Sequence, residues 1–278
     1  VAGRDGVTAC PPLVAYTSEH AHSSVEKACG MAGLGRANLR LVPSDPETLA
    51  MRPDELERLM DEDAAAGRIP FYVCTTCGTT SSGAIDDTAA ISEITRKHGA
   101  WLHLDGAMFG VAAICPEFRW VLAGAEHCDS VCVNPHKWLF TNFDCDLFWV
   151  ADRQALTRAL GIMPEYLRNA PSESGKVIDY RDWQVPLGRR FRALKLWLVF
   201  RHYGLEGLRT ALREHIAIAQ EFADMIDADP DWIRCAPSPL SLICIRHRDG
   251  DERTQAVLEA INASGEALLS HTKFDDYY

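Results

Sequence analysis

The sequence predicts an α/β fold with a mainly parallel sheet, followed by part of a smaller α+β domain. Strand-like and helix-like stretches alternate over roughly the first 150 residues, which is the pattern of a parallel sheet covered by helices. Prolines and glycines then interrupt this alternation, and a long helical periodicity follows them. We therefore expect a large domain over residues 1–195 and the start of a small domain over residues 196–278.

Short apolar stretches in the first part have the composition of buried strands. They are residues 14–16, 39–42, 71–76, 101–104, 130–133 and 148–150. Helices are predicted between the earlier strands. The first begins at Ser23, which stands three residues before Glu26 in a capping-box pattern. The second begins at Pro53, and the third is capped by Asp87 and ends at Gly99.

The second part of the chain has a different pattern of prolines, glycines and apolar residues. Residues 160–192 are predicted to form a functional loop because they contain Pro164, Pro171, Gly175, Pro186 and Gly188. Two helices should follow, since apolar residues recur three or four positions apart from Leu205 to Ile226. Residues 240–247 alternate like a strand, and residues 251–263 again have a helical pattern.

Composition narrows the class of protein. The 278 residues carry a formal net charge of −11, which argues against nucleic acid as the main partner. No apolar run is long enough to span a bilayer, and the first residues have no apolar segment of a signal peptide. The 10 cysteines lack the spacing of a disulfide framework, so we expect them to be reduced and the protein to be cytoplasmic.

Two charged residues follow neighbouring predicted strands. Asp105 ends the strand at residues 101–104, and Lys137 comes shortly after the strand at residues 130–133. Both should lie at the carboxyl edge of a parallel sheet, where ligand crevices open. Pyridoxal phosphate (PLP) takes a lysine Schiff base and an aspartate partner at its pyridinium nitrogen. The apolar neighbours of Lys137 favour the uncharged amine that this bond requires. A solvated lysine and a turn-forming aspartate are the simpler alternatives.

A zinc site is a second alternative. The possible ligands are His20, His22, Cys74, Cys77, Cys128 and Cys132. Cys74 and Cys77 lie within or beside an apparent buried strand, where small core residues are the simpler explanation, so we predict no metal. The polar residues 79–83 form either a plain turn or a set of hydroxyl groups that contact a cofactor.

Seven segments together resemble the group II PLP-dependent decarboxylases, and within that group the aromatic-L-amino-acid decarboxylases. They are YTSEHAHSSV (16–25), CGTT (77–80), WLHLDGA (101–107), ICPEFR (114–119), NPHKWL (134–139), NFDC (142–145) and DYRDWQVPLGRRFR (179–192). The resemblance runs across essentially the whole chain, and NPHKW is specific for the family. It implies a PLP-dependent transferase-like large domain of fold type I.

The resemblance also implies roles for individual residues. Lys137 would be the Schiff-base lysine and Asp105 the partner of the ring nitrogen. His22 would stack on one face of the ring and the methyl group of Ala107 on the other. The remaining residues that would line the cofactor are Thr80, Asn134 and His136.

The reaction implied is decarboxylation of an aromatic amino acid to the amine and CO2. Tyr166 matches the tyrosine of a mobile loop that returns a proton to the substrate carbon and closes over the partner subunit's site in a homodimer. Aldehyde-forming relatives replace this tyrosine or the stacking histidine. Because Tyr166 and His22 are both present, we favour the amine over the acetaldehyde product. Gly188 stands where relatives with bulky substrates carry glycine, which favours tryptophan or dopa.

The chain departs from the family at both ends. The family has a Gly/Ser-rich phosphate loop before the region that corresponds to residue 1, and its small domain continues beyond residue 278. We therefore expect a chain truncated at both ends. A catalytically incomplete fragment, or an interaction module on the same fold, stays open as an alternative.

Overall fold

The computed structural model describes residues 5–162 and 178–274, and most of its strands form one sheet. The strands of this sheet are β1 (Leu13–Ser18), β2 (Leu39–Val42), β3 (Ile69–Thr76), β4 (Trp101–Asp105), β5 (Ser130–Val133) and β6 (Leu147–Val150). Their order in space is β2-β1-β3-β4-β5-β6. All neighbours pair in parallel except β5 and β6, which are antiparallel. The predicted mainly parallel sheet is confirmed.

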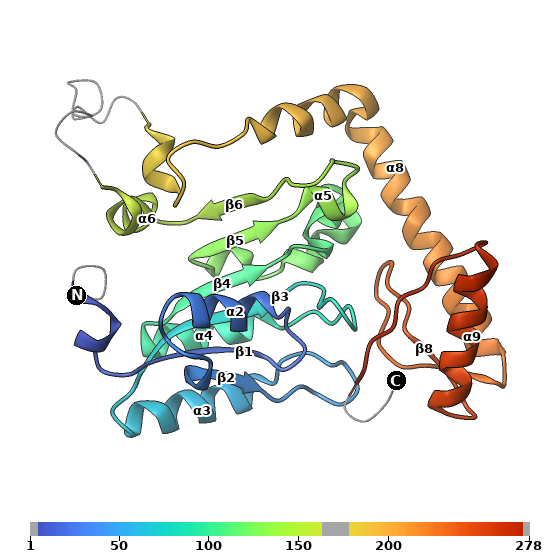
Figure 1. The fold of residues 1–278 in the computed structure, drawn as a ribbon, viewed down its shortest axis with the longest axis horizontal. Helices are drawn as coiled ribbons and strands as arrows, with labels where there is room; N and C mark the ends of the chain where they lie inside the picture. The colour runs from blue at the N-terminus through green and yellow to red at the C-terminus, as the bar shows by residue number, and fades with distance from the viewer. Residues whose placement is uncertain (1–4, 163–177, 275–278) are drawn as a thin grey trace.

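Helices α2 (Ser24–Met31), α3 (Pro53–Ala65) and α4 (Thr88–His98) accompany the first strands (Figure 1). Leu56 and Met60 of α3 and Ile91 of α4 are buried in the same core cluster as Val73 of β3 and Leu102 of β4. The apolar positions of these helices recur at helical spacing, so a single face of each is available for the sheet. Burial of these faces attaches the helices to the strands.

The predicted helix ends are partly confirmed. The Asp87 side chain accepts a hydrogen bond from Ala90 N at 3.0 Å, and Gly99 ends α4 in the left-handed conformation. The capping box at Ser23 is wrong, because Ser23 has helical dihedral angles and its side chain makes no capping hydrogen bond. The side chain of His22 makes a hydrogen bond at the start of the helix instead, because its Nδ1 accepts from Ser24 N at 3.2 Å.

The connection from β4 to β5 contains no α-helix. It consists of the 3₁₀ helices η3 (Phe109–Ile114), η4 (Pro116–Leu122) and η5 (Ala125–His127). After β5 the chain turns at once into the short helix α5 (Pro135–Trp138). Lys137 therefore lies on a helical turn shortly after β5, and Pro135 favours the first position of this helix.

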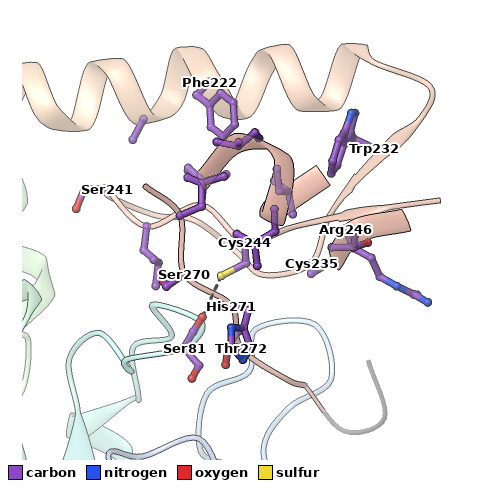
Figure 2. Close-up of a pocket in the computed structure, with 18 of the residues that line it drawn as sticks. Ser81, Phe222, Trp232, Cys235, Ser241, Cys244, Arg246, Ser270, His271 and Thr272 are labelled. Atoms are coloured by element: carbon purple, nitrogen blue, oxygen red, sulfur yellow. Dashed lines mark hydrogen bonds between the residues drawn. The ribbon is translucent and has the colours of Figure 1, made fainter. Parts of the chain in front are cut away.

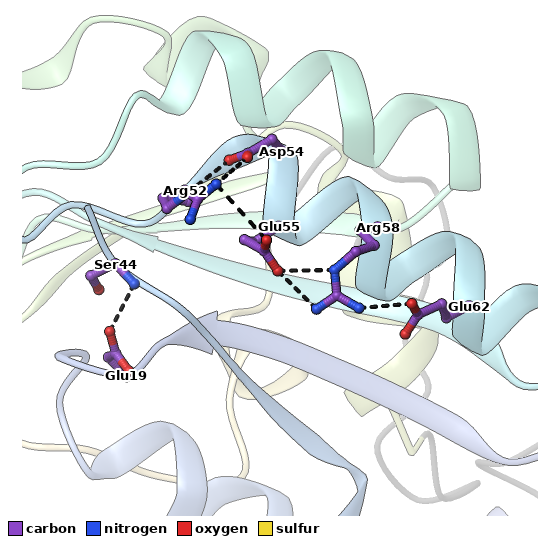
Figure 3. A network of polar contacts seen from close by, with 7 residues as sticks. All are labelled: Glu19, Ser44, Arg52, Asp54, Glu55, Arg58 and Glu62. Carbon is purple, nitrogen blue, oxygen red and sulfur yellow. Dashed lines mark hydrogen bonds and ion pairs between the residues drawn. The ribbon is translucent and has the colours of Figure 1, made fainter. Parts of the chain in front are cut away.

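The polar side of α3 carries exposed ion pairs (Figure 3). Arg58 pairs with Glu55 at 2.8 Å and with Glu62 at 2.7 Å, each about one helical turn away. Arg52, the residue before the helix, pairs with Asp54 in its first turn. Such pairs contribute little to stability individually because water screens them.

The inner side of α3 is held by a buried carboxylate. Asp63 accepts hydrogen bonds from Tyr16 Oη at 2.8 Å, from Arg40 at 2.9 and 3.0 Å, and from Arg68 at 2.6 Å. Burial opposes ionisation of this side chain, but these three partners hold the pKa of Asp63 below its usual value. The cluster joins α3 to β1, to β2 and to the turn before β3.

The second part of the chain is built around a long helix. It contains α6 (Arg153–Leu160), which was not predicted, η7 (Tyr180–Trp183) and α8 (Arg192–Ala228). Gly204 breaks α8 with a φ of 67° and a ψ of 169°, so the two predicted helices are confirmed as its two parts. Leu208, Leu212 and Ile216 of the predicted face are buried. Leu205 and Phe222 are 43% and 41% exposed, so the predicted face is too wide.

A small antiparallel sheet follows α8 (Figure 1). Its strands are β7 (Trp232–Arg234) and β8 (Ile245–His247), which pair with each other. Helix α9 (Asp251–Ser264) follows β8. Residues 240–244 are irregular, so the strand predicted over 240–247 is only partly confirmed, and β7 was not predicted. The remaining short 3₁₀ helices are η1 (Val7–Ala9) and η2 (Arg36–Asn38). None of the helices in the described residues has the length and apolar character needed to cross a bilayer.

Candidate active site

A polar cavity of about 410 Å³ lies at the carboxyl edge of the sheet. The described residues that line it are His22, Ser24, Thr76, Gly78, Thr80, Asp105, Ala107, Met108, Cys132, Asn134, His136, Lys137, Asp144 and Asp146. They follow the ends of β1, β3, β4 and β5, or directly precede β6. Because β6 runs antiparallel, its beginning lies at the same edge as the ends of the parallel strands.

A larger cavity of about 980 Å³ lies between α8, β8 and α9 (Figure 2). Its walls are mainly apolar, with Phe222 and Trp232 among the described residues that line it. None of those residues is a lysine, an aspartate or a glutamate. The smaller cavity has the groups needed for proton transfer and for covalent attachment, so it is the candidate active site.

Lys137 reaches this cavity from α5. Its neighbours Trp138 and Leu139 are buried, whereas the Lys137 side chain is exposed. The apolar surroundings expected from the sequence are therefore wrong, because the apolar neighbours turn into the core and leave the amine in a polar cavity. Trp138 Nε1 donates a hydrogen bond to His215 Nδ1 at 3.1 Å, which fixes α5 against α8. Among the residues that the structure describes, none pairs with the Lys137 amine.

Asp105 ends β4 and is oriented by its neighbours. Its Oδ1 accepts a hydrogen bond from Ala107 N at 2.9 Å and lies 3.6 Å from Cys132 Sγ, which donates to it. Burial, together with the Asp105 charge, raises the pKa of the Cys132 thiol, so the thiol keeps the proton that it donates. These contacts hold the carboxylate in one orientation toward the cavity.

Two histidines of the cavity are also held in place. The contact of His22 Nδ1 with Ser24 N fixes the ring at the start of α2. His136 Nδ1 lies 2.7 Å from Cys145 O and 3.0 Å from Cys145 N. The Phe143 ring meets the His136 ring edge-on, with 4.9 Å between centroids. Both rings therefore present defined faces to a ligand.

Two buried polar atoms in the cavity wall make no hydrogen bond to the described residues. Thr76 Oγ1 and Asn134 Oδ1 are buried, and neither has a hydrogen-bond partner in the described part of the chain. Buried polar atoms without a partner are costly, and in native proteins they commonly face a ligand or water. A cavity with these groups fits PLP. The buried polar atoms could bond its hydroxyl group, the unpaired lysine could react with its aldehyde, and the fixed carboxylate could bind its ring nitrogen.

Sequence reasoning missed two carboxylates in this cavity. Asp144 pairs with Arg192 at 2.8 Å, which lowers the pKa of Asp144 to about 2. The Asp146 residue is exposed overall, but the protein around its carboxylate desolvates that group and raises its pKa to about 6. The acidic residues of Asp144-Cys145-Asp146 stand just before a strand, but the local sequence does not show which edge of the sheet they reach.

The structure does not place two predicted site residues in the cavity, one because it is not described and one because it lies elsewhere. Tyr166 lies outside the described residues. Gly188 is not among the described residues that line the cavity, and no atom lies within 4 Å of the position that a Cβ would take there. Its neighbour Arg189 is close enough to Asp146 for its charge to act on that carboxylate.

The residues considered for zinc are dispersed. Cys74 and Cys77 are buried, with thiol pKa values raised by burial, and Cys128 donates to Gly124 O at 3.8 Å. Within residues 5–162 and 178–274, no three His, Cys, Asp or Glu side chains come together in a group that could hold a metal ion.

A lysine and a fixed carboxylate at the carboxyl edge of a parallel sheet define the class of site that holds an aldehyde cofactor. Comparison with known proteins narrows this class. The pyridoxal-dependent decarboxylase conserved domain matches residues 5–248, so the chain belongs to that family. PLP is the cofactor of this family.

The chain is similar to several characterised relatives. It is 44% identical to phenylacetaldehyde synthase of Arabidopsis thaliana over 96% of this chain and 56% of that protein. It is also 44% identical to aromatic-L-amino-acid decarboxylase of Mus musculus over 96% of this chain and 55% of that protein. The solved structure of Oryza sativa TDC with PLP and tryptamine matches with a TM-score of 0.94 and 41% identity, covering 99% of this chain and 59% of that one. The chain thus spans little more than half the length of these relatives.

Proposed function

We propose that the whole protein is a PLP-dependent carboxy-lyase that converts an aromatic L-amino acid to its amine and CO2. The observation that carries this proposal is the unpaired Lys137 facing the same cavity as the oriented carboxylate of Asp105. The similarity to aromatic-L-amino-acid decarboxylase and to a TDC structure with tryptamine supports an aromatic substrate, such as tryptophan or dopa.

The residues of the cavity have complementary roles in this proposal. When bound, the protonated ring of PLP takes up the electron pair that departing CO2 leaves on the substrate carbon. Lys137 would hold the aldehyde carbon covalently, and Asp105 would keep the proton on the ring nitrogen. His22 and Ala107 would cover the two ring faces. The other residues that would hold the cofactor are Thr76, Thr80, Asn134 and His136.

The fate of the substrate carbon separates two candidate products. In the proposed reaction Tyr166 donates a proton to this carbon and an amine is released. An aromatic acetaldehyde synthase, which consumes oxygen, is the second candidate, and the similarity to phenylacetaldehyde synthase favours it. We retain decarboxylation to the amine because His22 lines the cavity and Tyr166 is present in the sequence.

Further features are part of the same proposal. Gly188 would leave room for a bulky aromatic side chain, as the resemblance to the family implies. A cytoplasmic homodimer and a domain division into residues 1–195 and 196–278 are also proposed. The division is supported by the six-stranded sheet, which lies before α8, and by the two-stranded sheet, which lies after it.

The proposal is tested by trapping the cofactor. The purified chain is mixed with PLP, reduced with borohydride and mapped by peptide mass, and we expect the pyridoxyl label on Lys137. Lys137→Ala should lose this label and any turnover, whereas Lys97→Ala should keep both, because Lys97 pairs with Glu57 on the surface. A wild-type chain without label on Lys137 at saturating PLP would contradict the assignment of the site. Release of aldehyde and peroxide in place of amine would favour the second candidate.

A further inference from the structure

Asp146 occupies a position in the cavity that the proposed reaction does not use. The register of the antiparallel pair places Val133 opposite Leu147, so Asp146 lies beside Asn134 at the edge of the sheet. Lys137 follows Asn134 within one helical turn. Asp146 and Lys137 line the same cavity, Asp146 just before β6 and Lys137 just after the neighbouring strand β5.

None of the described charged groups near Asp146 forms an ion pair with its carboxylate. The titratable and charged groups that face it or line the same cavity are His22, Asp105, Cys132, His136, Lys137, Asp144 and Arg189. Asp144 is neutralised by Arg192, and Asp105 is occupied by Ala107 N and Cys132. In the described residues, neither Asp146 nor Lys137 forms an ion pair or a hydrogen bond through its side chain.

We propose that Asp146 is a positioning residue for Lys137, and that the Asp146 carboxylate attracts the lysine ammonium into the cavity. This inference rests on the proposed function of Lys137. Both residues are exposed, and opposite charges that line one cavity beside the protein surface attract each other more strongly than they would in bulk water. The attraction orients the amine before the cofactor is present.

The same attraction sets the pH at which Lys137 reacts. The ammonium must release one proton before its nitrogen attacks an aldehyde carbon. A carbon–nitrogen bond then forms, and the carbonyl oxygen leaves as water with the two remaining protons of the amine. An adjacent carboxylate stabilises the ammonium and so opposes the first loss of a proton. Its removal should make Lys137 reactive at lower pH.

Desolvation by the surrounding protein and the charge of Asp105 raise the pKa of Asp146 to about 6, against the opposing effects of His136, Arg189 and Lys137. At pH 7 Asp146 is therefore mostly ionised and acts on Lys137. Below pH 6 it becomes mostly neutral, and the attraction is lost as the pH falls.

The test measures the reactivity of Lys137 without the natural cofactor. The chain is treated with formaldehyde and cyanoborohydride across a pH series, and methylation of each lysine is followed by peptide mass. In Asp146→Asn we expect Lys137 to react about three- to tenfold faster near pH 7, the size expected for one nearby unit charge. Its pH profile should move to lower pH, while the profiles of Lys27 and Lys97 stay in place.

Two further variants complete the test. Asp146→Glu keeps the charge and should retain the wild-type profile, and Asp224→Asn removes an exposed charge on α8 and should change nothing. If Asp146→Asn does not fold, Asp146→Ser provides the same comparison. An unchanged Lys137 profile in a folded variant without the Asp146 carboxylate overturns the inference. Formaldehyde requires no PLP site, so a shifted profile together with absent PLP labelling would contradict the proposed function alone.

Discussion

Gly78 forms a wall of the candidate site at the point where β3 ends. Its φ of 90° belongs to the region that residues with a side chain rarely adopt. A Cβ at this position would lie 2.5 Å from Cδ2 of Phe109, which is fully buried in the core. The glycine thus allows the backbone that leads to Thr80 to pass directly over a core side chain.

We predict that Gly78→Ala lowers the free energy of unfolding by about 2–4 kcal/mol, since strain and overpacking act together. Gly67→Ala is the matched control, because Gly67 also has a positive φ of 76° but no atom within 4 Å of its Cβ position. Urea unfolding of both variants separates strain from overpacking. Equal losses of unfolding free energy in the two variants would show that the contact between the added methyl group and Phe109 does not lower stability.

The positions of Lys137 and Asp105 in the candidate site could be predicted from the sequence, but that of Asp146 could not. The first two follow apolar stretches that read as neighbouring parallel strands, so their common edge is implied by topology. Asp146 precedes its strand, and it reaches the same edge only because β6 reverses direction. Strand direction is set by pairing between strands and leaves no mark in the local sequence.

At the scale of elements, α3 shows that the two sides of one helix contribute differently. Asp63 faces inward with a side chain that is 5% exposed. Its carboxylate accepts hydrogen bonds from Tyr16, Arg40 and Arg68. Its neighbour Glu62 faces outward and pairs with Arg58 in solvent (Figure 3). Loss of a buried carboxylate would leave its partners without compensation, whereas loss of an exposed one would not.

We predict that Asp63→Ala lowers the free energy of unfolding by about 3–5 kcal/mol, as expected when one partner of a buried charged group is removed. Glu62→Gln on the same helix should leave the unfolding midpoint unchanged within measurement error. Thermal and urea unfolding of the two variants check this contrast. A midpoint for Asp63→Ala that matches the wild type would refute the structural role of the cluster.

Elements with a strong local signal could be predicted from the sequence. Asp87 and Gly99 bound α4 as expected because capping depends on residues that are adjacent in the chain. The capping box at Ser23 and the strand over 240–247 were misplaced for the opposite reason. His22 competes for the first turn of α2, and only the part of the strand opposite β7 finds a pairing partner.

At the scale of the whole molecule, Asp86 links stability to pH. Its carboxylate accepts hydrogen bonds from Met51 N and Thr76 N at 2.7 Å each. Burial nevertheless raises the pKa of Asp86 to about 6. A folded protein that holds a proton more tightly than the unfolded chain is stabilised below the unfolded pKa, and this stabilisation is lost as the pH rises through the folded pKa.

We predict that the wild-type protein loses stability relative to Asp86→Asn as the pH rises from 4 to 7. A pKa about two units higher in the folded state corresponds to roughly 3 kcal/mol over this range. The difference in the free energy of unfolding is measured by urea titration at each pH, with Asp224→Asn as the control. A difference that is independent of pH would contradict the effect of burial on Asp86.

The order of the strands has a consequence for synthesis of the chain. β2 and β3 flank β1, and each later strand then joins the free edge in the order in which it leaves the ribosome. The sheet can therefore grow by one strand at a time, with no gap to be filled by a segment made much later. The last described residue of the cavity, Asp146, is made before β6, whereas the core cluster still receives Leu208 and Leu240 later. A nascent chain therefore contains the described cavity residues before its core is complete.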